Sequence, residues 1–222
     1  MKKIFEGKIY EVLPKSDGII FPYQKAVVDE GDIVWYKMLS LENSTLTDVS
    51  ETIYWNMKFG SNYNIAVKVC KNFVAEKAII MPDGRLLLCN DNGQTFIIDT
   101  DGMINISGEI KYREAPPSDI AIYNNSIWAS FKDSNVLIRF NINTMRAELR
   151  IGGKASPFDC PEDIFIAGEW AYVCNKGSNK IIKVNLESYL VEDYYTFEEP
   201  IHSYVKSGNY EFVLLDSGLY VI

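Results

Sequence analysis

We predict an all-β fold for this chain of 222 residues, a five-bladed β-propeller closed by pairing of its N- and C-terminal strands. Three observations predict it. A four-strand unit recurs along the chain, each unit has the length of one propeller blade, and the last unit lacks a strand that the N-terminal residues can supply. Because 47% of the residues are hydrophobic, the chain can form one packed domain over residues 1–222.

The repeat is clearest in two segments that align without a gap over their first half. One is PSDIAIYNNSIWASFKDSNVLIRFN, from Pro117, and the other is PEDIFIAGEWAYVCNKGSNKIIKVN, which begins 44 residues later at Pro161. Each contains a nearly all-apolar run, an aromatic-rich run and an alternating run, separated by Asn, Asp, Gly and Ser. Buried and half-exposed strands joined by tight turns have these patterns.

Weaker copies of the unit begin near Gln24, Glu76 and Pro200. The copy from Pro200 ends at the C-terminus without a fourth strand, so we expect a strand within residues 2–12 to pair with it and to remove an exposed sheet edge. The first unit is long, with surplus residues at 61–75, and six blades are the alternative if that stretch forms a strand pair of its own. The predicted blades are 22–74, 75–116, 117–160, 161–199, and 200–222 completed by 1–21.

The best-matched region, about Pro116 to Phe197, resembles the repeats of YncE-like and virginiamycin-B-lyase-like (NHL-type) propellers. The likeness lies in the PSDIAI start, the SIWASF and WAYVC second strands, the SNVL and SNKI third strands and the IGG blade end. This resemblance implies blade architecture and no chemistry. The lyase members have a catalytic histidine and metal-binding acids. Here the single histidine, His202, lies outside the matched region, so lyase activity is not carried over.

Charge and hydropathy patterning indicate where the protein works. The net charge is −8 and no run of Lys and Arg exists, which argues against a nucleic-acid partner. The apolar runs are far shorter than the roughly 18–20 residues of a membrane-spanning helix, so no membrane partner is expected. The start MKKIFEGKIYEV lacks the apolar core of a signal peptide, which predicts a cytoplasmic protein. A component of a phage or tail-like particle is the alternative.

The cysteines and the motif content predict no cofactor and no metal. There are four cysteines, none in a CxxC pair, so we expect four free thiols and no zinc site. Cys89 and Cys174 fall at matching positions of two repeats, where a small buried side chain fits. No P-loop, dinucleotide fingerprint or Ser-His-Asp signature is present, and the sequence identifies no catalytic residue.

The most informative position is the second residue after the first residue of each predicted blade, which is residue 22, 75, 117, 161 or 200. It opens the innermost strand, so its side chains should ring one mouth of the central channel, as equivalent positions in a closed ring of repeats do. Polar side chains that converge on a channel are typical of a ligand site, although such residues also bond to the preceding turn. The candidate ligand-binding residues are Gln24, Lys77, Asp119, Asp163 and His202.

These features favour a non-enzymatic binding or scaffold propeller that presents loops to a protein partner. The irregular insert of residues 61–75 is the expected contact surface. A hydrolase or lyase acting at the channel mouth is the first alternative. A lectin-like, carbohydrate-binding propeller is the second, because the chain has four tryptophans, so a small molecule or a glycan is a possible ligand. The expected partner-contact residues are Tyr63, Val67, Val69 and Phe73.

Overall fold

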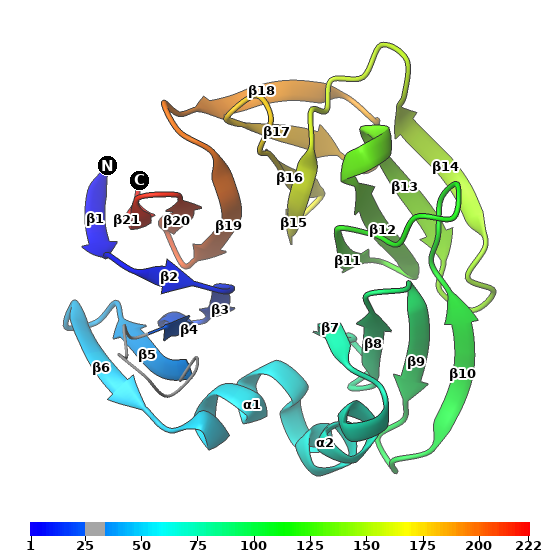
Figure 1. The fold of residues 1–222 in the computed structure, drawn as a ribbon, viewed down its shortest axis with the longest axis horizontal. Coiled ribbons are helices and arrows are strands. Elements are labelled where there is room, and N and C mark those ends of the chain that lie inside the picture. The colour runs from blue at the N-terminus through cyan, green and yellow to red at the C-terminus, as the bar shows by residue number, and fades with distance from the viewer. Residues whose placement is uncertain (25–33) are drawn as a thin grey trace, which may run out of the picture.

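Five small antiparallel sheets form a ring in the computed structural model, which describes residues 1–24 and 34–222 (Figure 1). Each sheet is one blade, which confirms the predicted five-bladed propeller and excludes the six-blade alternative. Blades 2, 3 and 4 follow chain order. Their strands are β7 (Ala75–Ile80), β8 (Leu86–Asn90), β9 (Gln94–Ile98) and β10 (Ile104–Glu109); β11 (Asp119–Tyr123), β12 (Ser126–Phe131), β13 (Val136–Asn141) and β14 (Ala147–Gly152); and β15 (Pro161–Ala167), β16 (Trp170–Asn175), β17 (Lys180–Asn185) and β18 (Val191–Thr196).

Apolar side chains between neighbouring blades form the core. Blades 3 and 4, where the repeat is clearest in the sequence, show this arrangement well. Trp128, 1% exposed, and Leu137 of blade 3 pack in one cluster with Ile164, Val173 and Ile182 of blade 4. The near-continuous apolar runs of the repeat are explained by this burial, because the inner and second strands of a blade face other blades on both sides.

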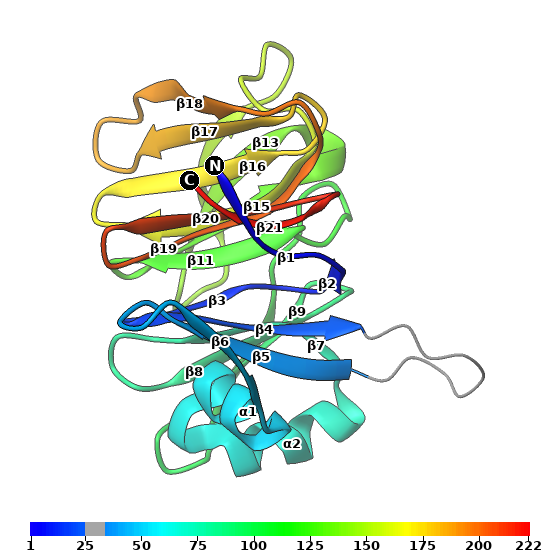
Figure 2. The same ribbon diagram turned by 90° about the vertical axis from the view of Figure 1, so that its left-hand side faces the viewer.

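Blade 5 is closed by the two chain ends, as predicted. Its strands are β19 (Ile201–Ser207), β20 (Tyr210–Leu215) and β21 (Gly218–Val221), and β1 (Lys2–Phe5) pairs antiparallel with β21. The register places Lys2 opposite Val221, so the N- and C-termini lie side by side (Figures 1 and 2). The last sheet thereby gains the fourth strand that the C-terminal segment lacks.

Blade 1 begins earlier than the sequence indicated, and the boundary at Pro22 is wrong. Residues 8–21, which we assigned to the last blade, belong to this blade, and Pro22 lies within its second strand. The inner strand was missed because residues 10–12 break it into two short pieces, which leaves no alternating run to recognise. The strands are β2 (Lys8–Ile9), β3 (Leu13–Lys15), β4 (Gly18–Gln24), β5 (Val34–Ser40) and β6 (Thr45–Val49).

A helix occupies most of residues 61–75, the region that we expected to be an irregular insert, and a second helix precedes it. They are α1 (Glu51–Phe59) and α2 (Tyr63–Asn72), joined by the short 3₁₀ helix η1 (Gly60–Asn62). The Ser50 side chain caps the start of α1 by accepting a hydrogen bond from the Ile53 amide. Helix α1 contacts β4 and β5 of blade 1 and β7 of blade 2, so it bridges these blades (Figure 1). Within the described part of the chain, no helix is both long and apolar enough to cross a membrane.

Candidate functional site in the central channel

The registers of the inner strands place one residue from each of four blades at the same level of the channel. Lys77, Asp119, Asp163 and Ser203 each lie opposite an equivalent residue of the second strand, respectively Cys89, Ser130, Cys174 and Leu214. We name five residues the channel belt: these four and Glu11 of blade 1.

Two cavities meet at the channel belt. The mouth cavity has a volume of about 450 Å³ and the throat cavity about 310 Å³, and both are lined by Glu11, Lys77, Asp163 and Ser203. The inner strands of all five blades contribute to the throat, which identifies it as the central channel. The mouth is rich in charged groups, whereas aliphatic side chains line the throat beyond the belt.

Two belt carboxylates bridge neighbouring blades in the same way. Asp119 accepts a hydrogen bond from the Ile164 amide of the next blade at 3.0 Å, and Asp163 accepts one from the Tyr204 amide of the blade after that at 3.2 Å. Ile164 and Tyr204 each follow a belt residue directly, so the same carboxylate-to-amide hydrogen bond occurs between blades 3 and 4 and between blades 4 and 5. Asp119 also forms an ion pair with Lys77, with 3.0 Å between Oδ1 and Nζ. The belt therefore links blades 2 to 5 as well as lining the cavity.

The belt contains one acid whose pKa is raised. Burial raises the pKa of Asp163 well above its usual range, the neighbouring Asp119 raises it further, and Lys77 opposes the shift. The shift favours the protonated form of Asp163 beside the Asp119 carboxylate. The Asp119 carboxylate in turn raises the pKa of Lys77, which stays charged. An acid with a raised pKa in a cavity is a frequent feature of functional sites.

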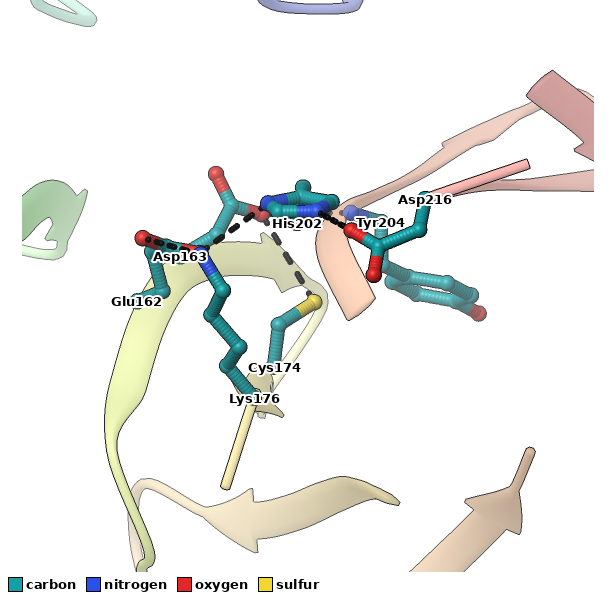
Figure 3. A network of polar contacts seen from close by, with 7 residues as sticks. All are labelled: Glu162, Asp163, Cys174, Lys176, His202, Tyr204 and Asp216. Atoms are coloured by element: carbon teal, nitrogen blue, oxygen red, sulfur yellow. Dashed lines mark hydrogen bonds and ion pairs between the residues drawn. The ribbon is translucent and has the colours of Figure 1, made fainter. Parts of the chain in front are cut away.

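His202 lies on the rim of the mouth, one residue before the belt (Figure 3). Its Nδ1 is 3.2 Å from a carboxylate oxygen of Glu162, and its Nε2 contacts Asp216. Lys176 pairs with the same Glu162, at 3.0 Å, so the rim is a connected network. We aligned His202 with Asp163 by matching Pro200 to Pro161. Ile201 pairs with the second strand as Pro161 does in blade 4, and a β-bulge follows each of them, so Ser203 is the residue equivalent to Asp163.

Gln24 does not open an inner strand, contrary to our expectation. It ends β4, the second strand of blade 1, and accepts a hydrogen bond from the Tyr10 hydroxyl at 3.3 Å. Glu11 occupies the channel in its place. Sequence reasoning missed Glu11 because the strand register of blade 1 was wrong. An acid between Tyr10 and Val12 in an apolar stretch was the signal that could have found it.

Helix α1 fixes the position of Glu11. The Glu11 carboxylate accepts hydrogen bonds from the Tyr54 hydroxyl and from Lys58 Nζ, the latter at 2.5 Å. Tyr54 and Lys58 are four residues apart and so lie on one face of α1. The helix pair therefore contributes directly to the channel wall through a buried ion pair.

The four expected partner-contact residues separate into two groups. Tyr63 and Val67 line a groove of about 370 Å³ on the helix pair. Phe73, 8% exposed, packs edge-on against Phe96 of blade 2, with ring centroids 4.4 Å apart, and Val69 packs against the same core cluster. Phe73 and Val69 therefore attach the helices to the ring, because α2 is amphipathic and turns one face inward.

Metal-ligating side chains do not gather within the described residues: no group of three or more His, Cys, Asp and Glu there could hold a metal ion. The belt acids are engaged instead with Lys77, Lys58 and backbone amides.

Comparisons with known proteins support the architecture. No family model matches the sequence, and no curated protein matches it either. Among solved structures, a streptogramin B lyase is similar at 10% identity and a TM-score of 0.51, covering 98% of this chain and 69% of that one. Virginiamycin B lyase from Staphylococcus aureus is similar at 13% identity and a TM-score of 0.51, covering 100% and 72%. The computationally designed Ika8 protein is similar at 8% identity and a TM-score of 0.52, covering 96% and 57%.

These likenesses define the class of protein by fold alone. The chain has the architecture of a YncE-like or virginiamycin-B-lyase-like propeller, with five blades. At such low identities the lyase activity of the neighbours says nothing of the reaction, if any, in this chain.

Proposed function

We propose that this chain is a non-enzymatic binding propeller whose ligand occupies the mouth of the central channel. The observation that carries the proposal is the mouth cavity of about 450 Å³, on which polar groups from several blades converge. A cavity of this size with a few directed polar groups and an acid of raised pKa is the usual form of a small-molecule site. Binding is favoured over catalysis because Asp119, Glu11 and His202 are each held by neighbouring charged groups.

A ligand screen with matched variants tests this proposal. Purified protein is screened by thermal shift against metabolites and glycans, and hits are confirmed by calorimetry. We expect hits to bind the wild type and Asp193→Asn, an exposed acid on β18, but to bind Asp163→Asn at least tenfold more weakly. Hits that bind all three proteins equally would place the ligand elsewhere. Conversion of a hit into product would favour the hydrolase or lyase alternative.

A protein partner at the helix pair is the second candidate function. The groove that includes Tyr63 and Val67 is apolar and aromatic along its length, and Trp55 stacks on Phe59 in it, with ring centroids 5.3 Å apart. Val74 beside it is 70% exposed. Glu51 and Lys71 also line this groove. The occupant that we propose is therefore a protein segment with an apolar anchor residue, flanked by a basic residue to pair with Glu51 and an acidic residue to pair with Lys71.

Cys70 provides the test of this second candidate, because its side chain lines the groove. A partner isolated from the native host is purified and added back, and alkylation of Cys70 is followed by mass spectrometry. The partner should slow alkylation of Cys70, and Val67→Glu should weaken binding, whereas Lys68→Glu, on the exposed side of α2, should not. Unchanged alkylation at saturating partner would exclude the groove. All four cysteines are free thiols. We propose on this basis that the protein works in a reducing compartment, the cytoplasm.

A further inference from the structure

We propose that the ligand of the channel is an amphipathic organic cation, with its ammonium group at the channel belt and its hydrocarbon part in the throat. This inference rests on the proposed function, because it names the ligand class of the same cavity. Three properties of the channel lead to it: the charge of the mouth, the neighbouring acids Asp119 and Asp163 at the belt, and the apolar lining of the throat.

The charge of the mouth favours a cation. Acidic side chains outnumber lysines around it: Glu76, Asp91, Asp133 and Glu162 lie on the rim besides the belt acids, against Lys77 and Lys132. Of these acids, Glu162 is already paired with Lys176 and His202. The belt lysine, Lys77, is already neutralised by Asp119 at 3.0 Å. A cleft lined mainly by charges of one sign concentrates ligands of the opposite sign and repels others. An anionic head group would therefore meet repulsion both on entering and at the belt.

The two neighbouring belt acids, Asp119 and Asp163, give the cation a place to bind. Asp163 lines both cavities, and the groups that face it are Asp119, Lys77, the Cys174 thiol and the Tyr204 amide. An ammonium group that donates N–H bonds to Asp119 and Asp163 can replace the proton that the raised pKa of Asp163 favours. Charge is then conserved at the belt, because one positive charge enters as the proton leaves to solvent. Binding without this exchange would add a charge to a site that is already balanced.

The throat provides an apolar environment for the hydrocarbon part of the ligand. Beyond the belt its lining includes Val12, Ile79, Ile122, Phe165 and Ile166. Water gains few hydrogen bonds from such walls, whereas a methylene chain replaces water there favourably. Burying each methylene group is expected to tighten binding by up to about fourfold.

Calorimetry with simple probes tests the proposal. Butylammonium, hexylammonium and octylammonium are titrated into the full chain, with octanoate and octanol as matched probes of equal length. We expect affinity to rise with chain length among the ammonium ions and octanoate to bind at least tenfold more weakly than octylammonium. Titrations in two buffers of different ionisation enthalpy should reveal about one proton released per ammonium bound. Asp163→Asn should lose at least tenfold in affinity and release no proton, and Asp193→Asn should behave as wild type.

Each other outcome overturns a defined part of the reasoning. Preferential binding of octanoate or octanol, sensitive to Asp163→Asn, would refute the cation while the channel site stands. Ammonium binding without dependence on chain length would refute the throat. If no probe binds, the inference is wrong, and the wider ligand screen alone decides the proposed function. If Asp163→Asn does not fold, the proton count of the wild type decides, and a count of zero overturns the exchange.

Discussion

Replacement of Asp119 by alanine should destabilise the ring more than the loss of any ordinary surface charge. Asp119 is 8% exposed and makes two contacts, the ion pair with Lys77 and the hydrogen bond from the Ile164 amide. A hydrogen bond to a charged group contributes about 1.5–3 kcal/mol. The ion pair adds only about 0.5–1 kcal/mol, because the Lys77 side chain is 35% exposed and solvent screens it.

We therefore expect Asp119→Ala to lower the free energy of unfolding by about 2–3 kcal/mol. Asp119→Asn should lower it by only about 1 kcal/mol, because the amide oxygen still accepts the Ile164 hydrogen bond. Urea denaturation followed by circular dichroism measures both values, and an unchanged denaturant slope shows that the native fold is retained. The control is Asp193→Ala on β18, where the side chain is 65% exposed and a loss below about 0.5 kcal/mol is expected. A loss below 0.5 kcal/mol for Asp119→Ala, or equal losses for Ala and Asn, would refute the bridging role.

Three further predictions concern closure, titration and thiol reactivity. Deleting residues 1–6, which removes β1, should expose the edge of β21 and produce concentration-dependent oligomers in light scattering; a monomer with unchanged melting would show that closure is dispensable. Because the pKa of Asp163 is raised in the folded state, the folded chain binds more protons, so the stability contributed by this residue falls as pH rises above the ordinary value of 3.8. Asp163→Asn should remove that part of the decline, and parallel pH–stability curves for the two proteins would contradict it. Burial raises the pKa of Cys89 to about 12 and that of Cys174 well above its usual range, so both thiols should react with Ellman's reagent only upon unfolding, and rapid reaction in the native state would disprove their burial.

The parts of the fold that could be predicted from the sequence are those where the repeat is regular. Asp119 and Asp163 were matched by a gapless alignment, and they make equivalent contacts in adjacent blades. The missing fourth strand of the last blade predicted closure by the N-terminus, because a sheet edge must be covered. Both inferences depend on spacing alone, which the repeat preserves.

The parts that could not be predicted are local departures from the repeat. The proline of blade 5 stands one residue earlier relative to its inner strand than the proline of blade 4, so an alignment anchored at Pro200 selects His202 instead of Ser203. The broken inner strand of blade 1 conceals Glu11, whose role depends on partners more than forty residues away in α1. The helix pair was not predicted, because the strand repeats on both sides favour strands there and outweigh the helical periodicity of the segment.

The way the ring closes also determines how it responds to mechanical force. Lys2 lies opposite Val221, so the two ends of the chain emerge at the same end of the β1–β21 pair. Tension applied between the termini therefore acts perpendicular to the β1–β21 strands and breaks the hydrogen bonds between them one after another. A parallel arrangement would load all of these bonds at once in shear. The closing strand is thus the weakest point under tension, and a modest pull should open the closed ring into an arc while the other blades stay folded.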